Sequence, residues 1–406
     1  MQVNTLSERA KVYFGSIQHG RDALFASLGA KLNKLIELLD FSTIERGDKV
    51  AVKMHLGYYD GCQTVPVFFV RRIVQAVKKA GAYPFITDNP TSAYNAVDRG
   101  YTSETCGCPI IPVTGVKDKY THPVTIGYRG VDTLEMGGVL HDADALIDLA
   151  HAKGHANCGY AGAIKNLAIG GYSAQSRWNK IHGVEDSIPW WKPDKCTPEH
   201  AQRLVEACPY SALKYDAAKH QLSIEWFRCH NSNCLECYKV DKKVRCLDIK
   251  PEAFAAFQEL MVLTAKQVLS RFNEKKRFFL NVALQITPDC DCLGIIQPCV
   301  VPDVGILASH DIIAIEQATL DLIQSAGLIE RSIPPYFKHV NLNPAAKLHP
   351  FTRLWGQMKN PYLITEFGEK HGLGTRKYEL IEVLSPEETA KVTPPEHEFE
   401  RQPTFY

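Results

Sequence analysis

The cysteines are the residues of this 406-residue chain best suited to chemistry, and six of the 13 fall between Cys196 and Cys246. Within that stretch, Cys208 is followed directly by Pro209, and three closely spaced cysteines come later. Thiolates bind soft metal ions and iron–sulfur clusters, so four cysteines in one short segment indicate metal ligation. The later three are Cys229, Cys234 and Cys237.

The spacing is typical of a ferredoxin, in which three close cysteines and a remote Cys-Pro hold iron–sulfur clusters. The match is incomplete, because four residues separate Cys229 from Cys234 where two are usual. Only Cys196 stands where three cysteines are expected before Cys208. We therefore predict one 4Fe-4S cluster on the four-cysteine set, with Cys196 and Cys246 as remnants of a second site. Zinc on the same four thiolates is the alternative.

A second group of reactive side chains follows the apolar stretch 145–150, which we expect to be a buried strand. The segment 151–171 contains five glycines, which let a ligand approach backbone N–H groups closely. Its lysines could hold an anion and its histidines could transfer protons, although the segment could also be a packed scaffold loop. It matches neither a P-loop nor a Rossmann fingerprint. The candidate catalytic residues are His151, Lys153, His155, Lys165 and Asn166.

Two further strand ends supply candidate substrate-binding side chains. The stretches 48–57 and 83–88 have the apolar character of buried strands. Lys53 and His55 lie toward the end of the first, and Asp88 ends the second. Because ligands bind beyond the carboxyl ends of the strands in doubly wound sheets, we expect these side chains to line one crevice.

A third pair of candidates, Cys290 and Cys292, follows the strand that we expect at 277–287. Cysteines separated by one residue share a face of an extended chain, so the two could bind a metal jointly. They form a possible second metal site, and the alternative is two buried thiols that pack as small apolar side chains.

Composition limits the classes of protein and partner. The chain is 45% hydrophobic and 22% charged, as is usual for globular proteins. Its net charge of +1 provides no basic field for nucleic acid or an anionic membrane. We find neither a signal-peptide core at the start nor an apolar run long enough to span a bilayer. We therefore expect a cytoplasmic protein with reduced cysteines, no nucleic acid partner and no membrane partner.

The elements that position these residues alternate between strand and helix, which predicts a doubly wound, mostly parallel α/β sheet. We expect an α/β domain in two parts, 1–189 and 251–385. A small ferredoxin-like α+β insert at 190–250 interrupts it, and a poorly ordered tail at 386–406 follows it. Helices are expected at 22–39, 66–81, 251–272 and 313–327, and a further strand at 304–309.

Together these motifs resemble the domain-of-unknown-function family 362, in its branch of iron–sulfur proteins. The segments "VKMHLG", "HAKGHANCGYAGAIKNLAIGG", "ITPDCDC" and "HGLGTRKYELI" carry the resemblance. It implies an α/β domain interrupted by a ferredoxin-type insert. The chain departs from the family at the cysteine-poor first half of the insert, at the stretched gap, and at Ile312, where a proline usually follows Asp311. The departures in the insert argue against a two-cluster electron relay.

These residues favour an iron–sulfur protein, an oxidoreductase or electron-transfer protein that acts on a small anionic substrate. A redox partner protein would then exchange electrons with the cluster. Two alternatives remain open: a non-catalytic electron carrier or metal-binding partner protein, and a non-redox enzyme with a structural zinc.

Overall fold

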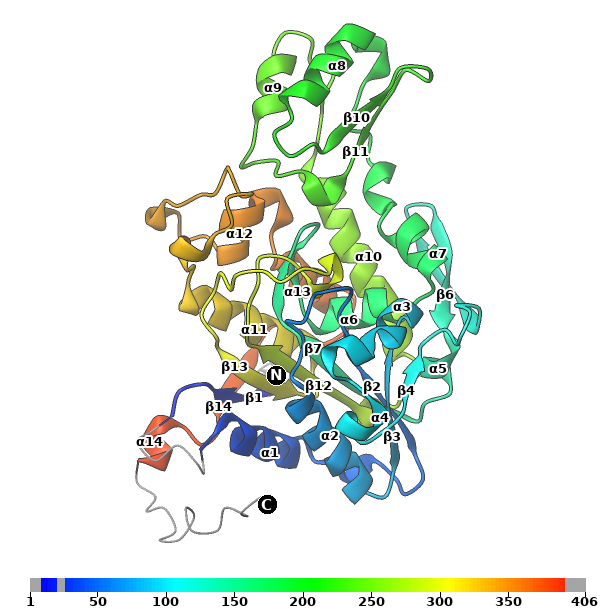
Figure 1. Ribbon diagram of the computed structural model, residues 1–406, viewed down its shortest axis with the longest axis vertical. Coiled ribbons are helices and arrows are strands. Elements are labelled where there is room, and N and C mark those ends of the chain that lie inside the picture. The colour runs from blue at the N-terminus through cyan, green and yellow to red at the C-terminus, as the bar shows by residue number, and fades with distance from the viewer. Residues whose placement is uncertain (1–8, 20–25, 391–406) are drawn as a thin grey trace, which may run out of the picture.

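The fold is built around one eight-stranded sheet that runs through the middle of the molecule (Figure 1). The computed structural model describes residues 9–19 and 26–390. The strand order is β14-β1-β13-β12-β7-β2-β3-β4, and only β13 runs antiparallel to its neighbours. The expected mixed α/β fold with a mostly parallel central sheet is confirmed. The strands are β1 (Ala10–Ser16), β2 (Lys49–Lys53), β3 (Tyr83–Asp88), β4 (Ile110–Pro112), β7 (Ala145–His151), β12 (Arg277–Ala283), β13 (Gly305–Ser309) and β14 (Tyr378–Glu382).

Helices cover both faces of the sheet, because its strands are apolar on both sides. Successive strand residues point to opposite faces, so Val52 packs with Leu35 and Ile73 on one face, while Ala51 and Leu146 join the core on the other. None of the described helices is both long enough and apolar enough to cross a membrane. The helices are α1 (Leu28–Leu39) and α2 (Val67–Lys79) on the first face, and α6 (Ala163–Gly170), α10 (Pro251–Leu269), α11 (Ile312–Ala326) and α13 (Leu363–Lys370) on the second.

Most of the expected elements occur where the sequence places them, but two features differ from a simple alternation. The loop 284–304 contains no α-helix, so β12 and β13 pair directly with each other and run antiparallel. A separate hairpin of β5 (Thr121–Tyr128) and β6 (Val131–Gly137) lies in a stretch for which the sequence pattern predicts no element. The tail expected at 386–406 begins with α14 (Pro386–Thr389), and its residues from 391 onward lie outside the described part of the chain.

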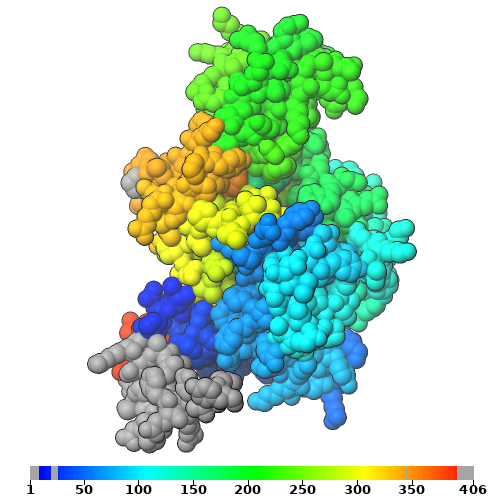
Figure 2. Space-filling model, in the orientation of Figure 1, coloured from blue at the N-terminus to red at the C-terminus, as the bar shows by residue number. Residues whose placement is uncertain are grey.

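The segment 190–250 forms a lobe at one end of the molecule, coloured green in Figures 1 and 2. It has a small core of its own, in which Trp190 packs edge-on against Trp226. A bridge between Trp191 and Leu247 ties the two ends of the lobe together. Its elements are α8 (Pro198–Ala207), the hairpin of β10 (Leu213–Asp216) and β11 (Gln221–Ile224), a 3-10 turn at Trp226–Arg228, and α9 (Glu236–Asp241).

The glycine-rich segment folds into a short hairpin, β8 (Lys153–His155) and β9 (Gly159–Ala161), directly before α6. Gly154 lies in β8, and a Cβ atom there would collide with the carbonyl oxygen of Pro288 in the loop 284–304. We therefore expect Gly154→Ala to lower the free energy of unfolding in urea by about 2–3 kcal/mol, through overpacking.

Gly127→Ala is the control for this variant. Its Cβ would meet nothing within 4 Å, although its φ of +65° is left-handed. That substitution should cost only the backbone strain of about 1 kcal/mol. Equal losses for the two variants would show that the hairpin is not held close to the loop.

Candidate functional site

A cavity of about 490 Å³ opens beyond the carboxyl ends of β2, β3 and β7. This is the place where ligands bind in open α/β sheets. The loop 284–304 and residues 224–227 of the lobe complete its wall. Every candidate from the strand ends and the glycine-rich segment lies on this wall, and so does the cysteine pair: Lys53, His55, Asp88, His151, Lys153, His155, Lys165, Asn166, Cys290 and Cys292.

Lys53 is fully buried and is paired entirely within the protein. Its Nζ donates to Asp88 Oδ1 at 3.0 Å, to Asn166 Oδ1 at 2.9 Å and to the Met54 carbonyl at 3.1 Å. These contacts use all three donors of the ammonium group. Asn166 in turn donates to Asp148 Oδ1 at 2.6 Å. Lys53 and Asn166 therefore position the wall of the cavity and fix Asp88.

His55 is held as a cation. Its Nδ1 lies 2.9 Å from Asp88 Oδ2, and the Leu56 N–H donates to the same oxygen at 3.0 Å. Burial opposes the charge, but Cys292 and Asp88 outweigh it and raise the pKa of His55 to about 9. Within the described chain, the Nε2 of His55 makes no well-aligned hydrogen bond. His55 can therefore donate a proton to a ligand in the cavity.

Cys290 and Cys292 form a hydrogen-bonded thiol pair. The hydrogen bond from Cys290 lowers the pKa of Cys292 well below its usual value, with help from Lys165 and His55. The same hydrogen bond raises the pKa of Cys290. Lys165 Nζ lies 3.5 Å from the sulfur of Cys292, which is exposed while Cys290 is buried. The lowered pKa favours the thiolate form of Cys292, which suits nucleophilic or redox chemistry.

His151 and Lys153 hold the loop that carries these cysteines. Both lie 3.1 Å from Asp291 Oδ2, His151 through Nδ1 and Lys153 through Nζ. The other ring nitrogen of His151 lies 2.7 Å from the Leu284 carbonyl. Both nitrogens of this buried ring are therefore engaged, so the geometry assigns His151 and Lys153 to positioning Asp291 between the two cysteines.

His155 is a neutral histidine of the cavity wall. Burial, assisted by the charge of Lys165, lowers its pKa well below the usual range. Its Nδ1 accepts from the Asn157 N–H at 3.2 Å and lies 3.2 Å from the Cys158 sulfur. The proton of the neutral ring then resides on Nε2.

Sequence reasoning assigned no role to two charged groups of this site, Arg177 and Asp289, and named Asp291 only as part of the Cys-Asp-Cys motif. Arg177 is 9% exposed and lines the cavity, yet its guanidinium makes no ion pair and no hydrogen bond with the described chain. Asp289 also lines the cavity, and burial raises its pKa to about 7. Asp289 and Asp291 both stand in the segment "ITPDCDC", which was the available signal. Arg177 has no motif, because its neighbours in the cavity come together only in the fold.

The four predicted cluster cysteines surround a separate small cavity of about 20 Å³ in the lobe. Cys208 follows the last residue of α8, while Cys237 is the second residue of α9. Cys229 and Cys234 come from the turn between the hairpin and α9. The lobe therefore gathers a set of cysteines that could bind metal, although they lie far apart in the sequence.

The spacing of these sulfurs bears on the kind of metal site. Among the described residues, no three of the four sulfurs lie mutually within 4.8 Å. A tetrahedral zinc with Zn–S distances near 2.3 Å holds its sulfurs about 3.8 Å apart. The arrangement is thus wider than a mononuclear zinc site. Cys290 and Cys292 likewise form no such triplet with a third ligand in the described chain, and metal binding there stays a prediction.

One segment links the two cavities. Ile224 lines both of them. Trp226 and Phe227 line the main cavity, and Cys229 follows two residues later on the wall of the small one. The four-cysteine site is therefore a direct neighbour of the main cavity.

Comparisons with known proteins agree with the resemblance seen in the sequence. A model of the family described as "Domain of unknown function (DUF362)" matches residues 50–321, more than half of the chain. A search of curated proteins gives no significant match. Among solved structures, the lactate racemase apoprotein from Thermoanaerobacterium thermosaccharolyticum matches with 12% identity and a TM-score of 0.32. The match covers 68% of this chain and 51% of that protein, so the chain spans about half its length.

The lowered pKa of Cys292 predicts reactivity at acidic pH. We expect iodoacetamide to alkylate Cys292 at pH 6 at least about tenfold faster than a thiol of ordinary pKa, measured by peptide mass spectrometry. Lys165→Gln removes a stabilising cation, so it should raise the pKa of Cys292 and slow the reaction at pH 6 about tenfold.

Lys180→Gln is the matched control, because Lys180 donates to the Thr133 carbonyl and does not line the cavity. This variant should alkylate like the parent protein. A Cys292 that reacts only above pH 8 in the parent protein would contradict the assignment of a thiolate.

Proposed function

This chain belongs to the family described as "Domain of unknown function (DUF362)", and from that premise we propose that it is an iron–sulfur oxidoreductase acting on a small anion. The proposal rests on the wall that the main cavity shares with the four-cysteine site. Ile224 borders both the main cavity and the four-cysteine site, and Trp226 and Phe227 join the main cavity to Cys229. Electron transfer falls off steeply with distance, so this adjacency suits an exchange of electrons between the two sites.

The four cysteines of the lobe fit an iron–sulfur cluster. All four donors are thiols, as a cubane requires, and their sulfurs are spread more widely than zinc would hold them. Cys208, Cys229, Cys234 and Cys237 would be the ligands. When bound, a 4Fe-4S cluster supplies one-electron transfer. A redox partner protein would supply or accept one electron for each electron that the substrate gains or loses.

An anionic substrate follows from the charges in the cavity. Arg177 lines the cavity without a carboxylate partner in the described chain, and its Nε is buried without a hydrogen-bond acceptor. A buried donor without an acceptor is costly. A carboxylate or phosphate group of the substrate can supply a counterion through two parallel hydrogen bonds. Lys165 and the protonated His55 add positive charge to the same wall.

Proton transfer at the substrate belongs to His55 and Asp289. His55 carries a proton at neutral pH and lines the cavity, and its buried Nε2 has no well-aligned hydrogen-bond partner in the described chain. Asp289 has a pKa of about 7, so it can accept or donate a proton near neutral pH. Lys53 and Asp291 would not touch the substrate, because their contacts within the protein position the reacting groups.

The first test is the metal content of protein purified without oxygen. We expect about four irons and about four acid-labile sulfides per chain, with the visible absorption of a cubane cluster. Cys234→Ser removes one ligand and should lose most of the iron. Cys62→Ser is the control, because Cys62 is exposed and lines neither cavity. Zinc in place of iron at the four-cysteine site, with no labile sulfide, would overturn the proposal.

The second test addresses the anion. Inorganic phosphate and small carboxylates such as oxalate should raise the midpoint of thermal unfolding of the iron-loaded protein. Arg177→Gln should weaken this binding roughly 10- to 100-fold, because one charge-assisted hydrogen bond contributes about 1.5–3 kcal/mol.

Arg203→Gln, an exposed change in the lobe, should bind these anions like the parent protein. Iron content should be the same in the parent protein and both variants. Anion binding that is equal in both variants would place the substrate elsewhere.

A further inference from the structure

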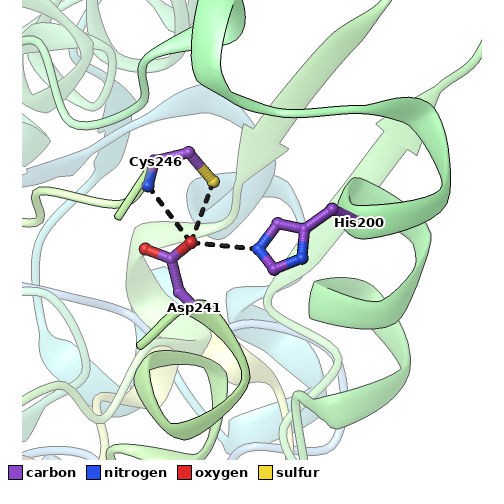
Figure 3. A group of neighbouring side chains, drawn as sticks. All are labelled: His200, Asp241 and Cys246. Atoms are coloured by element: carbon purple, nitrogen blue, oxygen red, sulfur yellow. Dashed lines mark hydrogen bonds and ion pairs between the residues drawn. The ribbon is translucent and has the colours of Figure 1, made fainter. Parts of the chain in front are cut away.

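A second group of metal-ligating side chains lies in the lobe, apart from the four-cysteine site (Figure 3). Asp241 Oδ1 lies 3.0 Å from His200 Nε2 and 3.1 Å from the Cys246 sulfur. One ligand atom of each residue lies within 4.8 Å of the others. All three side chains are buried, with exposures of 7% for His200, 2% for Asp241 and 0% for Cys246.

Cys196 adds a fourth donor to this group. Its thiol is close enough to that of Cys246 to raise the pKa of Cys246, and it is 5% exposed. Three residues separate Cys196 from His200, and four separate Asp241 from Cys246. Structural zinc sites use ligand pairs with such spacings, commonly two to five residues apart.

The group occupies a definite place in the lobe. His200 lies in the first turn of α8 and Asp241 ends α9, whereas Cys208 follows the end of α8 and Cys237 begins α9. The two helices pack against each other in opposite directions, so the two groups of ligands lie at opposite ends of the pair. None of the four residues lines the main cavity or the cavity of the cluster cysteines.

From this arrangement we infer that the lobe carries a second metal site, which binds one zinc-type divalent ion through Cys196, His200, Asp241 and Cys246. The donors are two sulfurs, one imidazole nitrogen and one carboxylate oxygen, all ligands that zinc accepts. Zinc–ligand distances of about 2.0–2.3 Å place tetrahedral ligands roughly 3.3–3.8 Å apart, close to the observed contacts of Asp241 with His200 and Cys246. Cys196 lies outside the group of ligand atoms within 4.8 Å of one another, so its side chain must move inward to complete the site. Binding releases the two thiol protons and uses neutral His200.

The site joins the beginning of the lobe to its end. Cys196 precedes α8, and Cys246 adjoins Leu247, which bridges to Trp191. The Cys246 carbonyl also accepts a hydrogen bond from the Lys192 N–H at 2.9 Å. An ion at this point closes a long loop of chain and stabilises the lobe without taking part in electron transfer.

The site is independent of the proposed function, and metal analysis of single variants separates the two. Tag-free protein should hold about one zinc per chain in addition to the metal of the four-cysteine site. Cys246→Ser and His200→Gln should lose that zinc, keep the iron and lower the midpoint of thermal unfolding. Cys234→Ser should lose the iron and keep the zinc. His220→Gln is the control in the same lobe, because its ring bonds to Tyr215.

Metal exchange on the unmutated protein tests the site without any substitution, so it is informative even if the variants do not fold. Removal of zinc with a chelator followed by cobalt(II) should produce the absorption of a tetrahedral cobalt–thiolate site, and zinc should displace it. A loss of bound zinc in Cys246→Ser supports the site even if the four-cysteine set holds no iron. The inference is overturned if the parent protein retains no zinc after gel filtration, if only Cys234→Ser removes it, or if Cys196 and Cys246 form a disulfide.

Discussion

The main cavity depends on the buried contacts of Asp291. Its carboxylate holds His151 at the end of β7 and Lys153 in the following hairpin, and so fixes the loop 284–304 over the sheet edge. Removing one partner from a buried ion pair costs about 3–5 kcal/mol, because the remaining charge is left without compensation. Since the loop also carries Cys290 and Cys292, this contact sets where the thiolate lies. The shape of the cavity is thus set by buried ion pairs within the protein, and these paired groups do not contact the ligand.

The remaining charges follow from that arrangement. Lys53 neutralises Asp88, and Asp88 together with Cys292 holds His55 as a cation. Lys165 balances the Cys292 thiolate. Arg177 is then the buried cation of the wall whose guanidinium contacts no carboxylate in the described chain, which is why an anion is the ligand best suited to the cavity.

Much of this could be predicted from the sequence, because apolar runs locate strands and parallel strands bring their carboxyl ends to one edge. Lys53, Asp88 and His151 converge for that reason. A local sequence pattern does not show which distant strands or side chains an element contacts in the fold. The direction of β13 depends on which strand it joins, the roles of the lysines depend on which carboxylates they meet, and Arg177 stands in a polar linker without a motif. The family was recognised correctly, and its model matches residues 50–321.

The lobe separates two sets of candidate metal ligands along one pair of helices. Four thiols gather at the end that borders the main cavity, where the proposed cluster would exchange electrons. At the other end, a carboxylate and an imidazole stand beside Cys196 and Cys246. An oxygen and a nitrogen donor suit zinc, which has no redox chemistry of its own. The cysteine-poor first half of the ferredoxin pattern therefore need not be an empty remnant, because its two cysteines lie among ligands that suit an ion which holds the lobe together.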